Sequence, residues 1–296
     1  MAVLSKNILK ILLVTVGLGL TGLLAACDEK TNNQPTIVVS VEPQRAMLEE
    51  IVGDRFKVVS VLQPGSNPET FEPTMTTRRE IDGAEAFMTT GNLPFEKSLA
   101  ASMSSDVAEI NVTRGITPVY GTHGHSHAHG HDHDHGEPDP HLWTSVRNAR
   151  VLAKNMYDAI LTIDPDGESY YAPRYEALDN RLDSLDRVFA VQLSGTLVPS
   201  RSFAVWHPSL SYLARDYGLE QIAVGFENKE MPAAQLAKVI EEAKEDSVKI
   251  FFFQREFDSR QAETLNERMG TKLVTINPLG YEWENELKKV VDALSR

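Results

Sequence analysis

The sequence predicts an α/β protein of two lobes, each with a parallel-rich sheet flanked by helices, joined by one long helix. The chain has 296 residues, which exceeds the length of a common single domain of about 100–200 residues. Short apolar segments rich in β-branched residues alternate with helical patterns in two separate regions, as expected of parallel sheets. An uninterrupted helical pattern of more than twenty residues lies between those regions and is suited to connecting them.

The first residues have the layout of a secretory signal. Lys6 and Lys10 precede an apolar run at 11–24 that ends in small residues before Cys27, the only cysteine. Residues 24–27 (LAAC) resemble the lipobox of bacterial lipoproteins. We therefore expect residues 1–26 to be removed and Cys27 to carry a lipid. The alternative is a transmembrane anchor, but the run is short and contains three glycines.

The remaining chain is expected to lie in the cell envelope, lipid-anchored, on the periplasmic or extracellular side. Residues 27–35 are polar and are expected to form a tether. Removal of the signal would change the formal charge from −13 to −15, because it takes away two lysines and no acid. An acidic protein is a poor partner for nucleic acid or anionic lipid and attracts cations modestly. A single cysteine also excludes an intramolecular disulfide and thiolate ligation by several cysteines.

The first lobe is predicted over residues 36–144. Segments with β-branched and apolar residues predict strands, and segments opened by proline or ended by glycine predict helices. The expected strands are 36–41, 58–62, 86–89 and 107–112, and the expected helices are 43–53, 76–82 and 94–103. Residues 114–140 break this rhythm with Gly, Pro, His and Asp, so a loop is expected there, with a His-rich part at 121–137.

Two helices are predicted in the middle of the chain. Apolar residues recur at helical spacing over 145–163, and Pro165 with Gly167 interrupts the pattern within the predicted segment 145–166. The next segment, 167–194, has one apolar stripe at spacings of three and four, which predicts a helix that connects the lobes. The stripe consists of Tyr175, Leu178, Leu182, Leu185 and Phe189.

The second lobe is predicted over residues 198–296, where the alternation resumes. The expected strands are 203–206, 221–223, 249–253 and 272–276. The expected helices are 209–217, 232–244, 259–269 and 283–294. No sequence repeat is strong enough to indicate duplication.

A histidine tract indicates contact with a transition metal. Seven histidines alternate with small or acidic residues: His123, His125, His127, His129, His131, His133 and His135. Imidazole nitrogen suits zinc, copper and nickel, and a flexible tract offers several imidazoles without a preformed cavity. We expect this loop to gather metal rather than hold it tightly. The alternative is a solvated loop that binds metal only incidentally.

Only two other histidines occur, His141 and His207. Each lies where a strand or loop meets the start of a predicted helix, the edge at which open α/β sheets build their sites. Singly, each is more often a hydrogen-bonded structural residue. One such histidine in each lobe favours a metal site between the lobes.

Several motifs resemble those of zinc and manganese substrate-binding lipoproteins of ABC transporters. The resemblance runs from about residue 36 to the C-terminus. Its motifs are 64–73 (PGSNPETFEP), 139–143 (DPHLW) with Asn148, His207 ahead of Tyr212 and 217–219 (YGL), and 277–280 (NPLG). Zinc members of the family commonly carry a His-rich loop at the same place. The resemblance implies two α/β lobes joined by a long rigid helix, with metal in the cleft between them.

The resemblance places four metal ligands at Glu69, His141, His207 and Asn277. The first position is usually histidine and the last usually aspartate, so Glu69 and Asn277 depart from the pattern. Glutamate is a competent zinc ligand, whereas a neutral amide is a poor one. The implied function is capture of Zn²⁺ and delivery to a membrane permease by a monomeric receptor that is not an enzyme. A receptor of the same type for manganese or another divalent metal is the alternative, and the imidazoles favour zinc.

The residues suggest three other functions. A metallohydrolase would use two histidines and a glutamate to activate water, but the sequence has no H-E-x-x-H motif and no identifiable general base. A nucleophilic Ser209 beside His207 lacks the G-x-S-x-G elbow. A metal-storage or adhesin lipoprotein would use the histidine tract as its main site. Deletion of residues 123–135 separates that class from a receptor, which keeps one tight site.

Overall fold

The computed structural model describes residues 34–120, 137–225, 232–257 and 259–295. The expected signal at 1–26, Cys27, nearly all of the tether and the seven histidines of the tract lie outside the described residues. The chain divides into two units, residues 1–34 and 35–296, and the fold below is that of the second unit. Among the helices of the described part, none is both long and apolar enough to cross a membrane.

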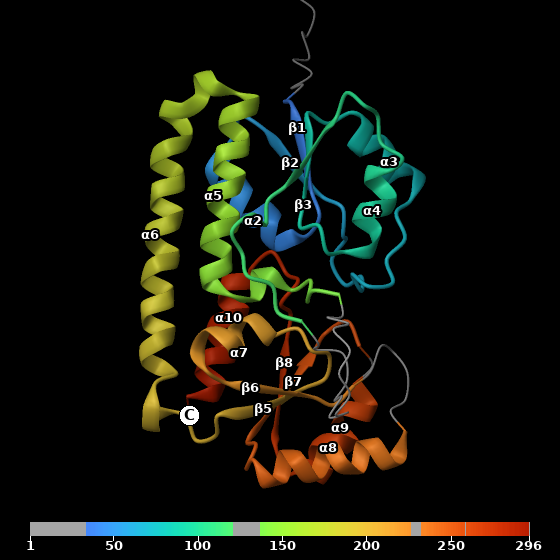
Figure 1. Ribbon diagram of the computed structural model, residues 1–296, viewed down its shortest axis with the longest axis vertical. Helices are drawn as coiled ribbons and strands as arrows, with labels where there is room; N and C mark the ends of the chain where they lie inside the picture. The colour runs from blue at the N-terminus through green and yellow to red at the C-terminus, as the bar shows by residue number, and fades with distance from the viewer. Residues whose placement is uncertain (1–33, 121–136, 226–231, 258, 296) are drawn as a thin grey trace, which may run out of the picture. The chain divides into compact units, whose positions relative to one another are not determined.

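The first lobe contains a four-stranded parallel sheet (Figure 1). Its strands are β1 (Thr36–Val39), β2 (Lys57–Ser60), β3 (Ala86–Thr89) and β4 (Ala108–Asn111), in the order β2-β1-β3-β4. Its helices are α2 (Glu42–Val52), α3 (Met75–Asp82) and α4 (Pro94–Ala100). Strand β1 is central, and Val38 pairs with Val59 on one side and Phe87 on the other.

The second lobe repeats this arrangement with the order β6-β5-β7-β8, again all parallel. Its strands are β5 (Ser202–Val205), β6 (Glu220–Ala223), β7 (Ile250–Gln254) and β8 (Lys272–Ile276). Its helices are α7 (Ser211–Tyr217), α8 (Ala233–Glu245), α9 (Ser259–Met269) and α10 (Trp283–Leu294). The two lobes therefore share one strand order without detectable sequence repetition.

Two long helices lie between the lobes in sequence, α5 (Val146–Ile163) and α6 (Glu168–Gln192), with the short 3₁₀ turns η1 (Leu142–Thr144), η2 (Pro165–Gly167) and η3 (Gly195–Leu197) around them. Helix α5 begins at Ser145, whose hydroxyl accepts a hydrogen bond from the Asn148 amide at 3.0 Å. Helix α6 contacts α5, α2 of the first lobe and α10 of the second (Figure 1). This confirms the predicted fold class, including its long connecting helix.

The predicted stripe of α6 is mostly buried. Leu178, Leu182, Leu185 and Phe189 are buried, whereas Tyr175 is half-buried and stacks on Tyr157 at 4.6 Å between ring centroids. Tyr171 takes the buried place one turn earlier. Most element bounds differ from the expected ones by one or two residues. The first strand ends at Val39, and Val41 is the residue that directly precedes α2.

Alternation along the central strands divides the core into three clusters. Ile37 and Val39 of β1 face a large cluster shared with α5 and α6, while Val38 faces a separate cluster under α3 and α4. Phe252 of β7 joins the shared cluster, and Phe251 faces a third cluster under α8 and α9. Because side chains alternate along a strand, each sheet has one face on the common core. The lobes are thus packed on one continuous apolar interior.

Ion pairs reinforce this connection. Arg181 of α6 bonds Glu50 of α2 at 2.7 Å and Glu284 of α10 at 2.9 Å, so one guanidinium holds a carboxylate from each lobe. The hydrogen bonds to Glu50 raise the pKa of Arg181 above its ordinary value. The Tyr281 hydroxyl donates to Glu49 at 2.7 Å, which adds a further link between the lobes.

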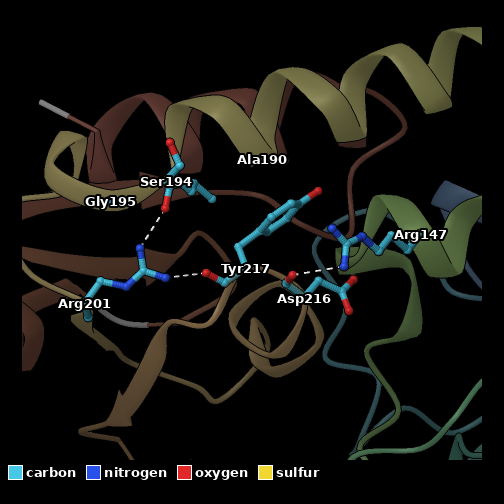
Figure 2. A pocket seen from close by; sticks show the side chains of 8 residues that line it. Arg147, Ala190, Ser194, Gly195, Arg201, Asp216 and Tyr217 are labelled. Carbon is cyan, nitrogen blue, oxygen red and sulfur yellow. Dashed lines mark hydrogen bonds between the residues drawn. The ribbon is translucent and has the colours of Figure 1, made fainter.

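Arg201 fixes the end of α6 to the second lobe. Its guanidinium donates to the carbonyl oxygen of Leu193 at 2.7 Å and to that of Tyr217 (Figure 2). It also donates to the carbonyl oxygen of Gly218 at 2.6 Å. Gly218 ends α7 in the left-handed conformation with φ of 62°, which glycine adopts without strain. Arg201, Leu193 and Tyr217 are among the residues that line a surface pocket of about 370 Å³. Since the guanidinium is committed to backbone carbonyls, its role here is to join two helix ends.

We expect Leu182→Ala to lower the free energy of unfolding by about 2–5 kcal/mol, because it empties a fully buried position in the stripe of α6. Val191→Ala on the same helix is the control, since Val191 is 66% exposed and its truncation should cost within about 0.5 kcal/mol. Urea unfolding followed by circular dichroism measures both. Equal losses in the two variants would contradict the packing described for α6.

Candidate metal centre

Glu69 comes from the loop that follows β2 in the first lobe. Its main-chain amide donates to the Asn67 side chain at 2.8 Å, which shapes the loop around it. The Glu69 side chain is 20% exposed. Because the carboxyl ends of parallel strands share one edge of a sheet, this loop lies at the edge where α/β proteins build binding sites.

His141 precedes the turn η1 and is held by Asp139. One Asp139 carboxylate oxygen accepts from the His141 main-chain amide and lies 2.8 Å from its Nδ1. Both side chains are almost completely buried. Burial alone would raise the pKa of Asp139, but the attraction and hydrogen bonds of His141 outweigh it and lower that pKa. An ionised carboxylate accepts Nδ1–H, which leaves the lone pair of Nε2 of His141 available to a metal.

Tyr212 and Thr144 fix the main chain around this pair. The Tyr212 hydroxyl, carried by α7 of the second lobe, donates to the Asp139 carbonyl oxygen at 2.8 Å. Thr144 donates its hydroxyl hydrogen to the His141 carbonyl oxygen, also at 2.8 Å. His141 therefore belongs to a segment that is anchored at several main-chain atoms before any ligand arrives.

His207 lies two residues beyond β5 and is held by Gln254, the last residue of β7. The Gln254 side chain accepts from the His207 amide at 3.1 Å and donates to the His207 carbonyl oxygen at 2.6 Å. The Gln254 side-chain nitrogen also donates to the Ser209 hydroxyl, at 2.7 Å. Sequence reasoning missed Gln254. Its signal in the sequence was a polar residue at the end of an apolar strand (IFFFQ), and the structure shows that this residue is fully buried.

The three side chains meet between the lobes. One donor atom from each of Glu69, His141 and His207 lies within 4.8 Å of the other two. The Glu69 carboxylate is 3.3 Å from Nε2 of His207, and the two imidazole rings have centroids 5.0 Å apart. His141 is 2% and His207 7% exposed. Two imidazoles and one carboxylate form a known zinc donor set with an open fourth position.

Aromatic rings enclose the cluster from both lobes. Trp143 packs edge-on against His141 at 5.6 Å between ring centroids, and Phe257 stacks on His207 at the same distance. Such walls restrict water and fix the ring orientations. The local dielectric is lowered as well, which strengthens electrostatic interactions at the site.

Asn277 lies one residue beyond β8, in the turn 277–280. Its main-chain amide donates to Glu286 at 3.0 Å, and its carbonyl oxygen accepts from the Gly280 amide at 3.0 Å. The side-chain nitrogen would lie 2.8 Å from a Cβ at Gly280, so this glycine makes room for the amide. Ligation by Asn277 stays a prediction.

We expect Asp139→Asn to raise the dissociation constant for zinc about 10- to 100-fold, because a neutral amide fixes the His141 tautomer less strongly. Competition against a chromophoric chelator measures the constant. Asp158→Asn is the control, since Asp158 is 52% exposed and pairs only with Lys154 on the same helix. A dissociation constant for Asp139→Asn that matches the control would show that Asp139 does not orient His141.

Comparison with known proteins identifies the family. The family described as ZnuA, zinc-uptake complex component A, periplasmic, matches residues 37–295. The high-affinity zinc uptake system protein ZnuA of Bacillus subtilis is 29% identical over 252 residues, covering 82% of this chain and 78% of that protein. The zinc-binding lipoprotein AdcA of Streptococcus pneumoniae is 28% identical over 90% of this chain, which spans 54% of AdcA.

A solved structure supports the same family assignment. A ZnuA deletion mutant with zinc bound superposes with a TM-score of 0.78 and 28% identity, covering 89% of this chain and 99% of the other. Membership of one family accounts for the two strand orders and the long helix α6. It also accounts for the match over almost the whole second unit. The resemblance noted in the motifs is confirmed, and the chain belongs to the ZnuA family of substrate-binding proteins for zinc uptake.

Proposed function

We propose that Glu69, His141 and His207 bind the zinc ion that this chain captures as the substrate-binding protein of an ABC transporter. The observation that supports this assignment is the meeting of three donor atoms from both lobes within 4.8 Å. Tetrahedral Zn²⁺ with ligands at about 2.1 Å holds its donor atoms about 3.4 Å apart. The 3.3 Å between Glu69 and His207 is already near this value.

Zinc is the favoured cargo over manganese. Mn²⁺ prefers oxygen ligands and higher coordination, whereas two imidazoles and one carboxylate suit Zn²⁺. The buried imidazoles also limit the number of waters that could complete an octahedral shell. A water molecule or the Asn277 side chain then takes the fourth position.

The chain performs this function by binding and release, as a monomer anchored by lipid on Cys27. Every ligand of the proposed site comes from one chain, so the site is complete without a partner copy. The Ser209 hydroxyl accepts from Gln254 and is buried, while Nε2 of His207 faces Glu69. This geometry favours ligation by His207 over activation of Ser209. The loaded lobes then deliver zinc to the membrane permease.

We expect His141→Ala and His207→Ala each to raise the zinc dissociation constant of the tight site by more than about 100-fold, because each removes a ligand rather than a hydrogen-bonding partner. The measurement is competitive zinc titration with metal counting on residues 28–296. His127→Ala, which removes one histidine of the tract, is the matched control. Unchanged tight binding in either ligand variant would refute the site.

We expect deletion of residues 123–135 to remove only weak sites and to leave one tight zinc site of unchanged dissociation constant. The reason is that the three donor atoms of the proposed site already lie within 4.8 Å of one another, so binding there orders few groups. Metal counting at saturating and at limiting zinc measures both classes of site. Loss of the tight site with the tract would instead support a storage lipoprotein.

A further inference from the structure

A second acidic residue, Glu256, lies at the edge of the second sheet beside His207. In the order β6-β5-β7-β8, the chain leaves β5 toward β6 and β7 toward β8, so β5 and β7 form the topological switch point. Ligands of open α/β sheets bind outside the carboxyl ends of strands at that point. His207 follows β5 by two residues and Glu256 follows β7 by two residues, which places them on either side of the switch point.

The turn that carries Glu256 is attached to His207 at both ends. Gln254 bonds the His207 main chain on both its amide and its carbonyl side. Phe257 stacks its ring on the His207 imidazole, with 29° between the planes. The Phe257 amide donates to the Gln254 carbonyl oxygen at 3.3 Å, which closes the turn. Glu256 is therefore held between two residues that both contact His207.

The far side of this turn is attached to β8. The Arg255 amide donates to the Ile276 carbonyl oxygen at 3.0 Å, which continues the pairing of β7 with β8 beyond the last strand residue. The turn is thus fixed to His207 on one side and to the residue before Asn277 on the other.

Glu256 lies between Gln254, which bonds the His207 main chain, and Phe257, which stacks on the His207 ring. The Glu256 side chain is half-buried, and burial raises its pKa, whereas its own main-chain amide and the attraction of His207 act in the opposite direction. Within the described segments, no ion pair neutralises this carboxylate. It also lies outside the group of three donor atoms that meet within 4.8 Å. Its chemistry is therefore that of a nearby charge and not of a ligand.

Resting on the proposed function, we propose that Glu256 is a positioning residue that acts through His207 and stabilises the zinc-bound imidazole. Zn²⁺ bound by one carboxylate and two imidazoles keeps one net positive charge. The Glu256 carboxylate supplies the matching negative charge from the second lobe, whereas the ligand Glu69 belongs to the first. In a site walled by aromatic rings, such a charge acts more strongly than in water.

The test compares Glu256→Gln with wild type in competitive zinc titration. The isosteric amide removes the charge and keeps the shape, so the dissociation constant should rise about 10- to 100-fold. The d–d absorption of the Co²⁺-substituted protein should keep its position and intensity, because the ligands are unchanged. Glu256→Asp, which retains the charge, should restore most of the affinity.

Glu263→Gln on α9 is the matched control, because it removes one exposed negative charge from the same lobe. A rise of less than threefold for Glu256→Gln, or an equal rise for Glu263→Gln, would overturn the proposal. A changed Co²⁺ spectrum would also overturn it, since Glu256 would then be a ligand. If Glu256→Gln fails to fold, Glu256→Ala takes its place: a rise of about 10- to 100-fold in the dissociation constant with an unchanged Co²⁺ spectrum supports the proposal, and a rise of less than threefold overturns it. Failure of the proposed function is distinguishable, because His207→Ala would then retain the tight site.

Discussion

The packing of the two lobes on one apolar core is the constraint on which the metal centre depends. Glu69 and His207 come from different lobes, and their 3.3 Å separation exists only while the lobes keep their relation. The shared cluster contains strand residues from both sheets together with the stripe of α6. Arg181 adds charged contacts to both lobes at the middle of that helix. A relative shift of about one ångström would thus disturb a site whose ligands must lie within a few tenths of an ångström of their ideal distances.

Within this packed frame, buried polar side chains fix the positions of the two histidines. Asp139 and Gln254 both have 1% exposure or less, and each bonds one histidine of the proposed site at main-chain atoms. Asp139 also fixes the tautomer of His141. Gln254 bonds only the main chain of His207, and the Phe257 ring orients the His207 imidazole. The two imidazoles are thereby prepared by different means. This preorganisation lowers the entropy lost on binding, and it separates the rigid centre from a histidine tract that has no such support in its sequence.

Much of the fold could be predicted because the patterns that determine it are local. Alternating strands and helices, Pro165 with Gly167 and the stripe ending at Phe189 are each visible within about twenty residues. His141 and His207 were also predictable, since their places before helices could be recognised along the chain. Gln254 and Glu256 were not, because their relation to His207 depends on β7 lying beside β5. Residues separated by 47 positions meet there through strand order, which no local pattern specifies.

The departures from the family pattern at Glu69 and Asn277 have a common electrostatic meaning. A histidine replaced by glutamate adds one negative charge near the metal, and an aspartate replaced by asparagine removes one, so the number of carboxylates among the four positions is unchanged. The charge has moved from the second lobe, after β8, to the first, after β2. With this change alone, His207 would be the contact between the metal and the second lobe. That lobe would then carry no charge at the four ligand positions. Glu256, in the turn between β7 and α9, returns a negative charge to that lobe without replacing the imidazole donors. The attraction that the metal exerts on both lobes is then balanced, while the nitrogen ligands that favour zinc are retained.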